Sequence, residues 1–253
     1  NVGITLWNGG TLYIDEGKPT PKGIATTLRN LREIAPTVYF NVPKGFEEIA
    51  RAMDHDAALR ERLFSRVQAF MFAGAGLSQA VWDHLDRHGE QTVGERICMF
   101  TGLGMTETAP SCTFAVGTDV KSGDIGLPVP GVEVKLSPEG EILIKSPGQM
   151  AGYYKQPELN AECFTDDGFF CTGDLGRYDD LGQLVLTGRK KELFKTAKGK
   201  YVAPAPIENR LNAHPMVELS MVSGMGQPAA YAVVVLDEHL RPKLSDDAVR
   251  ARV

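Results

Sequence analysis

The sequence lacks several features that would place it quickly in a class of protein. Its 253 residues contain no apolar run that approaches the roughly 20 residues of a membrane-spanning helix. Its four cysteines, Cys98, Cys112, Cys163 and Cys171, form neither a C-x-x-C pair nor a zinc-type spacing. The first residues, NVGITLWNGG, do not resemble a signal peptide. We therefore expect free thiols in a reducing compartment and a cytoplasmic protein with no membrane span.

A basic excess is missing as well. The chain has 27 Lys and Arg against 32 Asp and Glu, a formal net charge of -5. Because nucleic-acid binders usually carry a basic excess, we expect no nucleic-acid partner. One dense basic stretch, GRKKELFKTAKGK, runs from Gly188 to Lys200. It is either a solvated loop or a segment that meets phosphate groups.

Apolar strands and amphipathic helices alternate in the first part of the chain. The expected strands are TVYFNV, AFMFAG and ICMFTG. The expected helices are one that begins near Ile24 and is stopped by Pro36, and others over residues 46–53, 57–67 and 79–89, the last capped by Ser78 and stopped by Gly89. Apolar strands separated by helices favour a mostly parallel sheet. The stretches VGITL and TLYID flank Gly9 and Gly10, which predicts a short hairpin or strand pair.

The pattern changes near Gly117. VEVKL and EILIK enclose the turn from Ser137 to Gly140, which predicts a hairpin. A helix at 206–211, the strand AAYAVVVLD and a last helix from about Ser245 follow. The predicted fold class is α/β: a parallel-sheet subdomain (1–117), an antiparallel β-barrel-like subdomain (118–188) and the start of a small α+β C-terminal domain (189–253).

The most informative stretch is the loop GLGMTET, from Gly102 to Thr108. It follows a predicted buried strand, and open α/β sheets bind ligands at such strand ends. Thr106 could hydrogen-bond phosphate oxygens, and Glu107 could bind Mg²⁺, a hard cation that prefers carboxylate oxygen. The alternative is a tight loop with a capping threonine and a solvated glutamate.

Other motifs leave alternatives open or exclude a class. GAGLSQ and GLGMTE do not complete G-x-G-x-x-G, no phosphate-binding P-loop motif occurs and no serine lies in a G-x-S-x-G elbow, which argues against dinucleotide-binding and hydrolase sites. Asp174 either holds ribose hydroxyls or serves its own turn. His84 and His88 lack the glutamate of a zinc protease, so we expect a solvated helix face.

The order of these motifs resembles one known family. The motifs that carry the resemblance are, in order, AGAG, GLGMTET, GDIGLPVPGVEVK, GEILIKSPGQMAGYYKQPE, DGFFCTGDLG and GRKKELFKTAKGKYVAP. The order resembles that of the adenylate-forming (AMP-binding) superfamily, which includes acyl- and aryl-CoA synthetases. The resemblance covers almost the whole chain. KYVAPAPIEN and NVGITLWNGGTLYIDEGKP look most like feruloyl-CoA and long-chain acyl-CoA synthetases, and we favour the hydroxycinnamate branch.

The resemblance implies a role for each matching residue. Gly74, Ala75 and Gly76 would line the nucleotide and acyl pocket, and Gly102, Leu103, Gly104 and Met105 would border the adenine and the acyl group. Thr106 would bind phosphate and Glu107 the Mg²⁺. Asp174 would hold the ribose with help from Arg189, Lys191 would be a domain hinge, and Gly199 would approach the pantetheine tunnel. Thr106, Glu107 and Lys191 would thus serve catalysis.

The implied activity is an AMP-forming carboxylate–CoA ligase that uses ATP, Mg²⁺ and CoA on an acid such as ferulate. The family's TSGTTGxPKG-type phosphate loop and its C-terminal catalytic lysine are absent, and Leu103 replaces a frequent adenine-stacking aromatic. We therefore expect a fragment that is inactive alone. Alternatives are acyl transfer to a carrier protein and a truncated homologue that binds nucleotide or a partner without catalysis. Whether the chain forms a homo-oligomer stays open.

Overall fold

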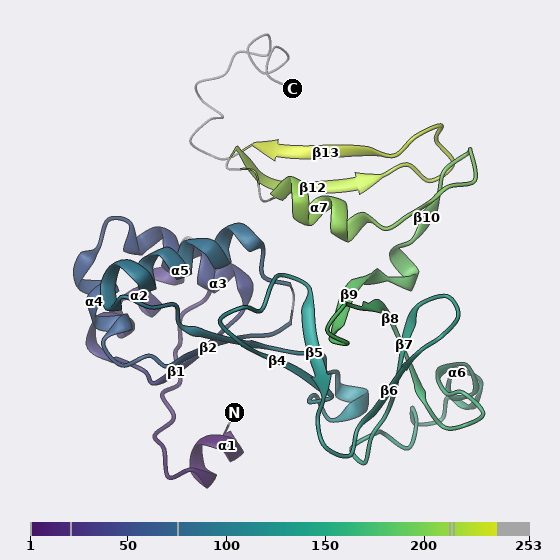
Figure 1. Cartoon of the computed structure of the whole chain (residues 1–253), viewed down its shortest axis with the longest axis horizontal. Helices are drawn as coiled ribbons and strands as arrows, with labels where there is room; N and C mark the ends of the chain where they lie inside the picture. Colours follow the sequence, from purple (N-terminus) through teal and green to yellow (C-terminus); the bar gives the residue numbers. More distant parts are fainter. Residues whose placement is uncertain (1, 21, 75, 213, 215, 237–253) are drawn as a thin grey trace. The chain divides into compact units, whose positions relative to one another are not determined.

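The structure is a computed structural model that describes residues 2–20, 22–74, 76–212, 214 and 216–236 (Figure 1). The helix expected from about Ser245 lies outside the described residues. The chain divides into two compact units, one made of Asn1–Ala75 and Asp83–Cys98, the other of Gly76–Trp82 and Met99–Val253.

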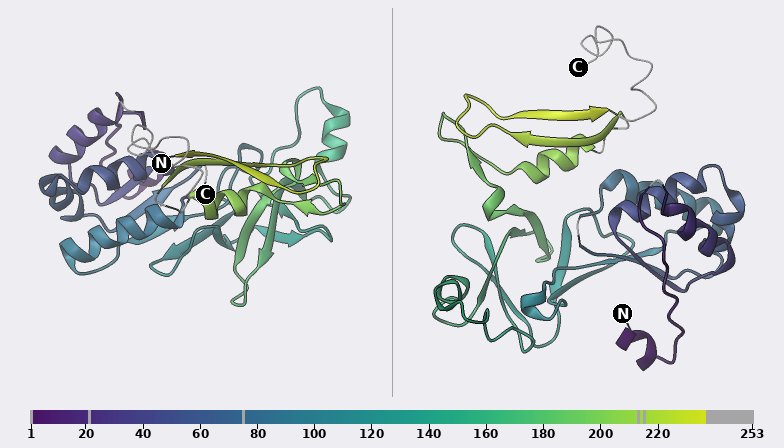
Figure 2. Two further views of the ribbon diagram at one scale, coloured as in Figure 1. Left: turned by 90° about the horizontal axis from the view of Figure 1, so that it is seen from above. Right: turned by 180° about the vertical axis from the view of Figure 1, so that it is seen from behind.

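The first unit contains a parallel strand pair and several helices. Its elements are α1 (Val2–Trp7), α2 (Ile24–Glu33), β1 (Val38–Asn41), α3 (Pro43–Met53), α4 (Ala57–Phe64), β2 (Ala69–Phe72) and most of α5 (Gln79–Val93). Strand β1 pairs in parallel with β2, as expected. Phe70 of β2 packs edge-on against Phe46 and Phe64, with ring centroids 5.5 and 5.9 Å away. The helices lie beside the strands of this unit (Figure 2), and buried apolar side chains of α3 and α4 surround Phe70 of β2.

Two predictions in this unit are wrong. The stretch before Gly9 is helix α1 and not a strand, because Gly9 adopts a φ of 67° and ends the helix. Gly10 N–H donates to Thr5 O and Gly9 N–H to Leu6 O, the paired bonds of a glycine helix cap. Gly89 does not stop α5: a Cβ there would lie 2.9 Å from the Glu95 carbonyl oxygen, so this glycine serves close packing.

The second unit contains an open sheet. Its elements there are β3 (Cys98–Thr101), η1 (Thr106–Thr108), β4 (Thr113–Gly117), β5 (Asp124–Pro128), β6 (Glu133–Leu136), β7 (Glu141–Lys145), α6 (Pro157–Cys163), β8 (Phe170–Tyr178) and β9 (Leu184–Arg189). The strands run in the order β3-β4-β5-β9-β8-β7-β6 and pair antiparallel. The α/β fold class is confirmed, whereas the described strands do not close into a barrel.

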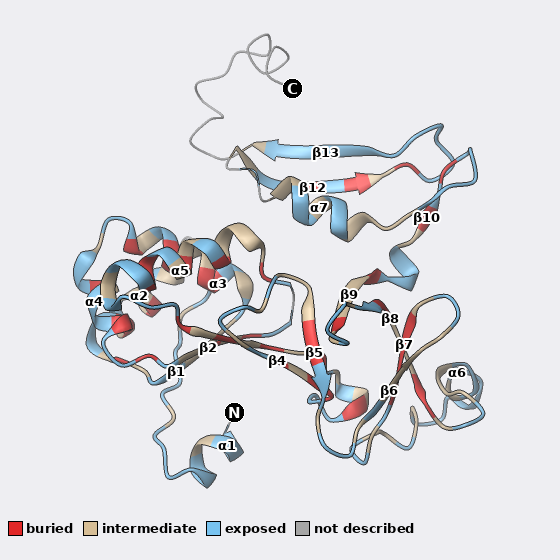
Figure 3. Cartoon of the chain, viewed as in Figure 1, coloured by how far each residue is buried: buried red, intermediate tan, exposed pale blue. Residues whose placement is uncertain are grey.

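Strand β7 lies at the centre of this unit's core. It is buried from Glu141 to Ile144, and it forms the predicted hairpin with β6 (Figure 3). Ile142 and Ile144 are fully buried and pack with Leu103, Cys112, Ile125 and Leu184. Because a buried strand presents both faces to other residues, its apolar run does not alternate. Glu141 is the exception, a buried carboxylate in an apolar strand.

A helix and two small sheets complete the second unit. After η2 (Lys190–Glu192), β10 (Phe194–Lys195) pairs with β11 (Tyr201–Val202), and α7 (Pro204–Asn212) packs on β12 (Val217–Ser223), which pairs with β13 (Tyr231–Leu236). The predicted helix at 206–211 and the predicted strand are therefore confirmed. In the described part of the chain, none of the helices has the length and apolar character needed to cross a membrane.

Candidate functional site

The loop after β3 is held tightly against the start of β4. The backbone oxygen of Leu103 accepts from the N–H groups of Cys112 and Thr113, and Leu103 N–H donates to the Thr113 hydroxyl at 3.1 Å. A Cβ on Gly102 would lie 1.9 Å from the Thr113 carbonyl oxygen, and one on Gly104 would lie 2.4 Å from the Pro110 carbonyl oxygen. Both glycines are therefore required by the close approach of two backbone segments.

The end of this loop presents two polar residues. Thr106 is exposed and Glu107 is half-buried in the short helix η1. The Tyr153 hydroxyl donates to Glu107 Oε1 at 2.8 Å, and Met150 N–H donates to the Glu107 carbonyl oxygen at 2.8 Å. Because its proton is held by Glu107, the pKa of Tyr153 rises to about 12. Glu107 is thus fixed in place by the segment that follows β7.

Asp174 lies in β8 directly opposite Arg189 at the end of β9. Its side chain is 4% exposed, and its Oδ1 lies 2.9 Å from Nε of Arg189, whose side chain is 65% exposed. Burial raises the pKa of Asp174, and the nearby Arg189 guanidinium only partly opposes this. The pair therefore holds a buried acceptor beneath an accessible guanidinium.

A second buried carboxylate is held in the same way. Glu141 Oε1 accepts from Gly173 N–H at 2.9 Å, and Glu141 Oε2 accepts from Lys190 Nζ at 2.7 Å. The hydrogen bond from Lys190 to Glu141 raises the pKa of Lys190. Consecutive cations, Arg189 and Lys190, therefore bind two carboxylates that lie on neighbouring strands.

Lys191 comes next and is exposed in η2. It borders an open cavity of about 390 Å³ whose other walls include Phe194, Glu208, Val222 and Met225. Cys163, at the end of α6, has a raised pKa, mainly because of burial and then because of the charge of the neighbouring Glu162.

The remaining predicted residues lie in separate loops. Gly199 is in the turn between β10 and β11, where its N–H donates to the Thr196 carbonyl oxygen at 2.9 Å. Gly74 and Gly76 follow β2, and a Cβ on either would meet no other atom within 4 Å. Ala75 lies outside the described residues. Met105 is half-buried and packs against the core around β7.

Three contributors were not singled out from the sequence. Tyr153 and Glu141 stand in the quoted motif GEILIKSPGQMAGYYKQPE, and Lys190 stands in the basic stretch. Their partners lie 46, 32 and 49 residues away along the chain. No local pattern marks a contact over such a separation. A charged residue directly before an apolar run, as Glu141 stands before Ile142, is the one signal that was available.

The histidine pair is a further correction. His88 is 4% exposed, so the predicted solvated helix face is wrong. Its Nε2 lies 3.0 Å from the Ala50 carbonyl oxygen and 3.3 Å from Asp54 Oδ1. Burial lowers the pKa of His88 below the usual value for histidine. The face of α5 that carries His84 and His88 therefore packs against the end of α3.

Comparisons with known proteins identify the class. The family model of the AMP-binding enzymes matches residues 1–154, more than half of the chain. The chain belongs to this family. A long-chain-fatty-acid–CoA ligase of Mycobacterium tuberculosis is 31% identical over 85% of this chain and 43% of its own length. A probable 4-coumarate–CoA ligase of Dictyostelium discoideum is 36% identical over 63% of this chain and 32% of its own length.

Solved structures agree on the fold. An anthranilate–CoA ligase in complex with anthranoyl-AMP has a TM-score of 0.74 at 23% identity, over 96% of this chain and 47% of its own. ATP-bound MatB from Rhodopseudomonas palustris has a TM-score of 0.72 at 27% identity, over 96% of this chain and 50% of its own. The chain spans less than half of the length of each of the two curated relatives described above.

Proposed function

We propose that the chain is part of an AMP-forming carboxylate–CoA ligase. A substrate carboxylate attacks the α-phosphorus of ATP and displaces pyrophosphate, and the thiol of CoA then displaces AMP from the acyl-adenylate. The observation that carries the proposal is the Asp174–Arg189 pair in a chain of the AMP-binding family. A buried carboxylate can accept from both ribose hydroxyls, while the exposed guanidinium beside it faces an anionic ligand.

Thr106 and Glu107 are proposed to interact with the phosphate groups of ATP. Thr106 offers an exposed hydroxyl to phosphate oxygens at the end of the loop that Gly102 and Gly104 shape. Glu107 would hold a Mg²⁺, since Mg²⁺ commonly takes only one or two carboxylates and Tyr153 engages one oxygen of Glu107. Such a cation would offset the charge of the ATP phosphates. Fixed positive and polar groups of this kind stabilise the transition state of adenylation without a covalent side-chain nucleophile.

The finer assignments belong to the same proposal. We infer that residues 1–117 and 118–188 are parts of a large domain and that residues 189–253 begin a small one, with Lys191 as the hinge and Gly199 on the loop that approaches CoA. The acid is proposed to be aromatic, such as ferulate. The likeness to a probable 4-coumarate–CoA ligase supports an aromatic acid. Other relatives are named as ligases of long-chain fatty acids or of malonate, and these favour an aliphatic acid instead.

Nucleotide binding tests the proposal on the chain as it stands. We expect Asp174→Asn to weaken AMP binding, measured by calorimetry, by roughly tenfold or more, since a hydrogen bond to a charged group contributes about 1.5–3 kcal/mol. Asp180→Asn, in the exposed turn after β8, is the matched control and should leave affinity unchanged. Equal affinity of both variants and the original chain would remove Asp174 from the ribose site.

Catalysis is tested on the protein encoded by the complete reading frame that contains this chain. Pyrophosphate release with ferulate, benzoate, palmitate and malonate identifies the acid. Formation of a CoA thioester separates a CoA ligase from an enzyme that delivers its acyl group to a carrier protein. Binding of AMP with no pyrophosphate release from any acid would favour the non-catalytic homologue.

A further inference from the structure

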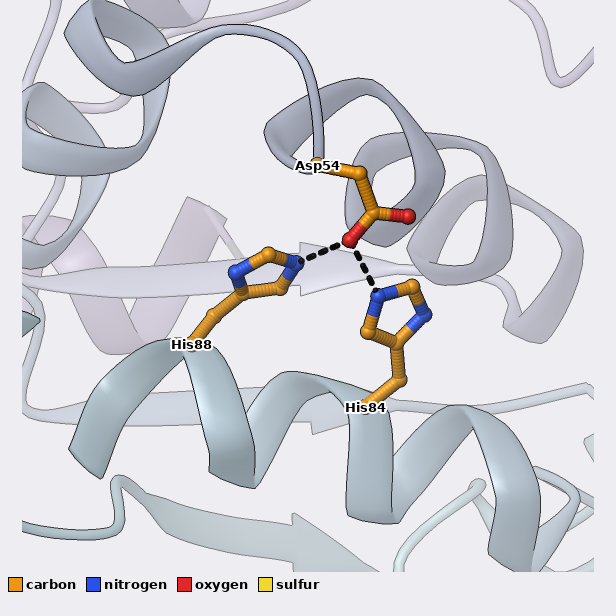
Figure 4. Close-up of side chains that lie close together, drawn as sticks. All are labelled: Asp54, His84 and His88. Atoms are coloured by element: carbon orange, nitrogen blue, oxygen red, sulfur yellow. Dashed lines mark hydrogen bonds and ion pairs between the residues drawn. The ribbon is translucent and has the colours of Figure 1, made fainter. Parts of the chain in front are cut away.

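A cluster of three ligand-type side chains lies in the first unit, two from α5 and one from the residue that follows α3. His84 and His88 are four residues apart on α5, and both direct Nε2 at the carboxylate of Asp54, the C-cap of α3 (Figure 4). Nε2 of His84 lies 2.7 Å from Asp54 Oδ1, and Nε2 of His88 lies 3.3 Å from the same atom. The two rings stack with centroids 4.8 Å apart.

The separations are close to those of a metal site. One ligand atom from each residue lies within 4.8 Å of the others. In a tetrahedral zinc site with bonds of about 2.0–2.1 Å, the ligand atoms lie about 3.3 Å from one another. Asp54 is exposed and His84 is half-buried, so these two side chains are the ones that could adjust toward this arrangement. Two histidines at i and i+4 on one helix direct their Nε2 atoms to a common point, as helical metal motifs do.

We propose that Asp54, His84 and His88 bind one divalent transition-metal ion of the zinc or cobalt class. The imidazole nitrogens supply two borderline ligands and the carboxylate a third, a donor set that suits Zn²⁺ better than Mg²⁺ or Ca²⁺. The side chain of Asp54 is 41% exposed and that of His84 is 22% exposed, so water has access to a fourth position. The ion would join the end of α3 to α5 and stabilise this unit.

Metal binding competes with two interactions present in the structure. His88 Nε2 lies 3.0 Å from the Ala50 carbonyl oxygen, and its proton must move to Nδ1 before a metal can bind. His88 Nδ1 is buried without a hydrogen-bond partner, so no second bond fixes the tautomer. The positive charge of Arg60 also acts on His88 and opposes a cation. We therefore expect micromolar rather than nanomolar affinity.

The test uses the whole chain and the metal alone. Calorimetry with Zn²⁺ should give one equivalent bound, and Co²⁺ should give the visible absorption bands of a tetrahedral site. His84→Gln is the main variant because His84 is partly exposed, and it should weaken Zn²⁺ binding at least tenfold. Asp54→Asn should do the same, which keeps the test valid if one variant misfolds.

His55→Gln is the matched control, since His55 is exposed and adjacent to Asp54 in sequence. It should leave the affinity and the Co²⁺ spectrum unchanged. The proposal is overturned if no stoichiometric binding occurs, if both His84→Gln and Asp54→Asn bind Zn²⁺ as the original chain does, or if His55→Gln loses as much affinity as His84→Gln. In those cases hydrogen bonds alone hold the two imidazoles on the carboxylate.

Nucleotide affinity is measured in parallel and should not change with His84→Gln, which separates this test from that of the ligase proposal.

Discussion

Lys190→Met should destabilise the second unit by leaving a buried carboxylate without its cation. Methionine keeps most of the apolar stem of lysine but removes the ammonium group. Glu141 would then keep the N–H of Gly173 as a partner while its Oε2 loses the lysine. Because an unpaired buried charge costs more than the pair itself contributes, the loss should exceed that of an ordinary surface ion pair.

The magnitude follows from the unequal burial of the two partners. Exposed ion pairs contribute about 0.2–1 kcal/mol, whereas removal of one partner from a fully buried pair costs about 3–5 kcal/mol. The Glu141 side chain is 7% exposed, but that of Lys190 is 56% exposed and is screened by water. We therefore expect a coupling energy of about 1–2 kcal/mol between the two side chains, intermediate between these limits.

A double-mutant cycle of Lys190→Met and Glu141→Gln measures this coupling. Urea unfolding followed by far-UV circular dichroism gives the free energy of unfolding of each variant. Lys198→Met, at an exposed lysine in the next loop, is the matched control and should change stability little. A coupling energy below about 0.3 kcal/mol would refute the reasoning, because the pair would then behave as an ordinary exposed one.

The pH dependence provides a second check on this pair. The pKa of Lys190 is raised in the folded chain by Glu141. A raised pKa in the folded state means that the stabilisation is complete below the unfolded pKa and is lost as pH rises through the folded one. The stability difference between the original chain and Lys190→Met should stay constant from neutral pH up to the ordinary lysine range and should shrink only above it.

Three further predictions concern the candidate site. Asp174 has a raised pKa in the folded chain, so the stability of the original chain relative to Asp174→Asn should be greatest in acid and should fall as pH rises through that raised pKa, measured by urea unfolding across pH. Tyr153→Phe removes the donor to Glu107 and should change stability by about 1 kcal/mol while altering the Mg²⁺ dependence of ATP binding; an unchanged Mg²⁺ dependence argues against Glu107 as the ligand. Gly102→Ala places a Cβ against the Thr113 carbonyl oxygen and should cost about 3 kcal/mol or more in unfolding experiments, whereas a neutral effect would show that the loop can move.

Helices and strands that bury one apolar face could be predicted from the sequence. α3 and α4 show this, because their buried residues recur at helical spacing and Asp56 caps α4 by accepting from Leu59 N–H. The strand pair expected around Gly9 was wrong because none of the described residues of α1 is buried. Without a buried face, period alone does not separate a helix from a strand, and the paired hydrogen bonds at Gly9 decided the outcome.

The residues of the candidate site could be singled out from the sequence one by one, but the contacts between them could not. The glycine loop, Glu107 and Asp174 stand in recognisable motifs, and the pairing of β8 with β9 places Asp174 opposite Arg189. The bond from Tyr153 to Glu107 depends on the path of the chain between β7 and α6, which no local pattern specifies. His88 was misjudged for a related reason: a helix face that looks polar can still pack against another helix when its polar atoms find partners there.

The two carboxylate pairs also bear on the proposed hinge. Arg189 and Lys190 are bound to Asp174 and Glu141 immediately before Lys191, which is exposed and has no such partner among the described residues. Releasing either cation would leave a buried carboxylate without its cation, which costs free energy. A domain rotation that begins after these two residues avoids that cost. Rotation of the following segment should therefore begin at Lys191 and not earlier. In that arrangement the Arg189 guanidinium would stay over the proposed ribose site in both proposed half-reactions, while only Lys191 and the residues after it would change position.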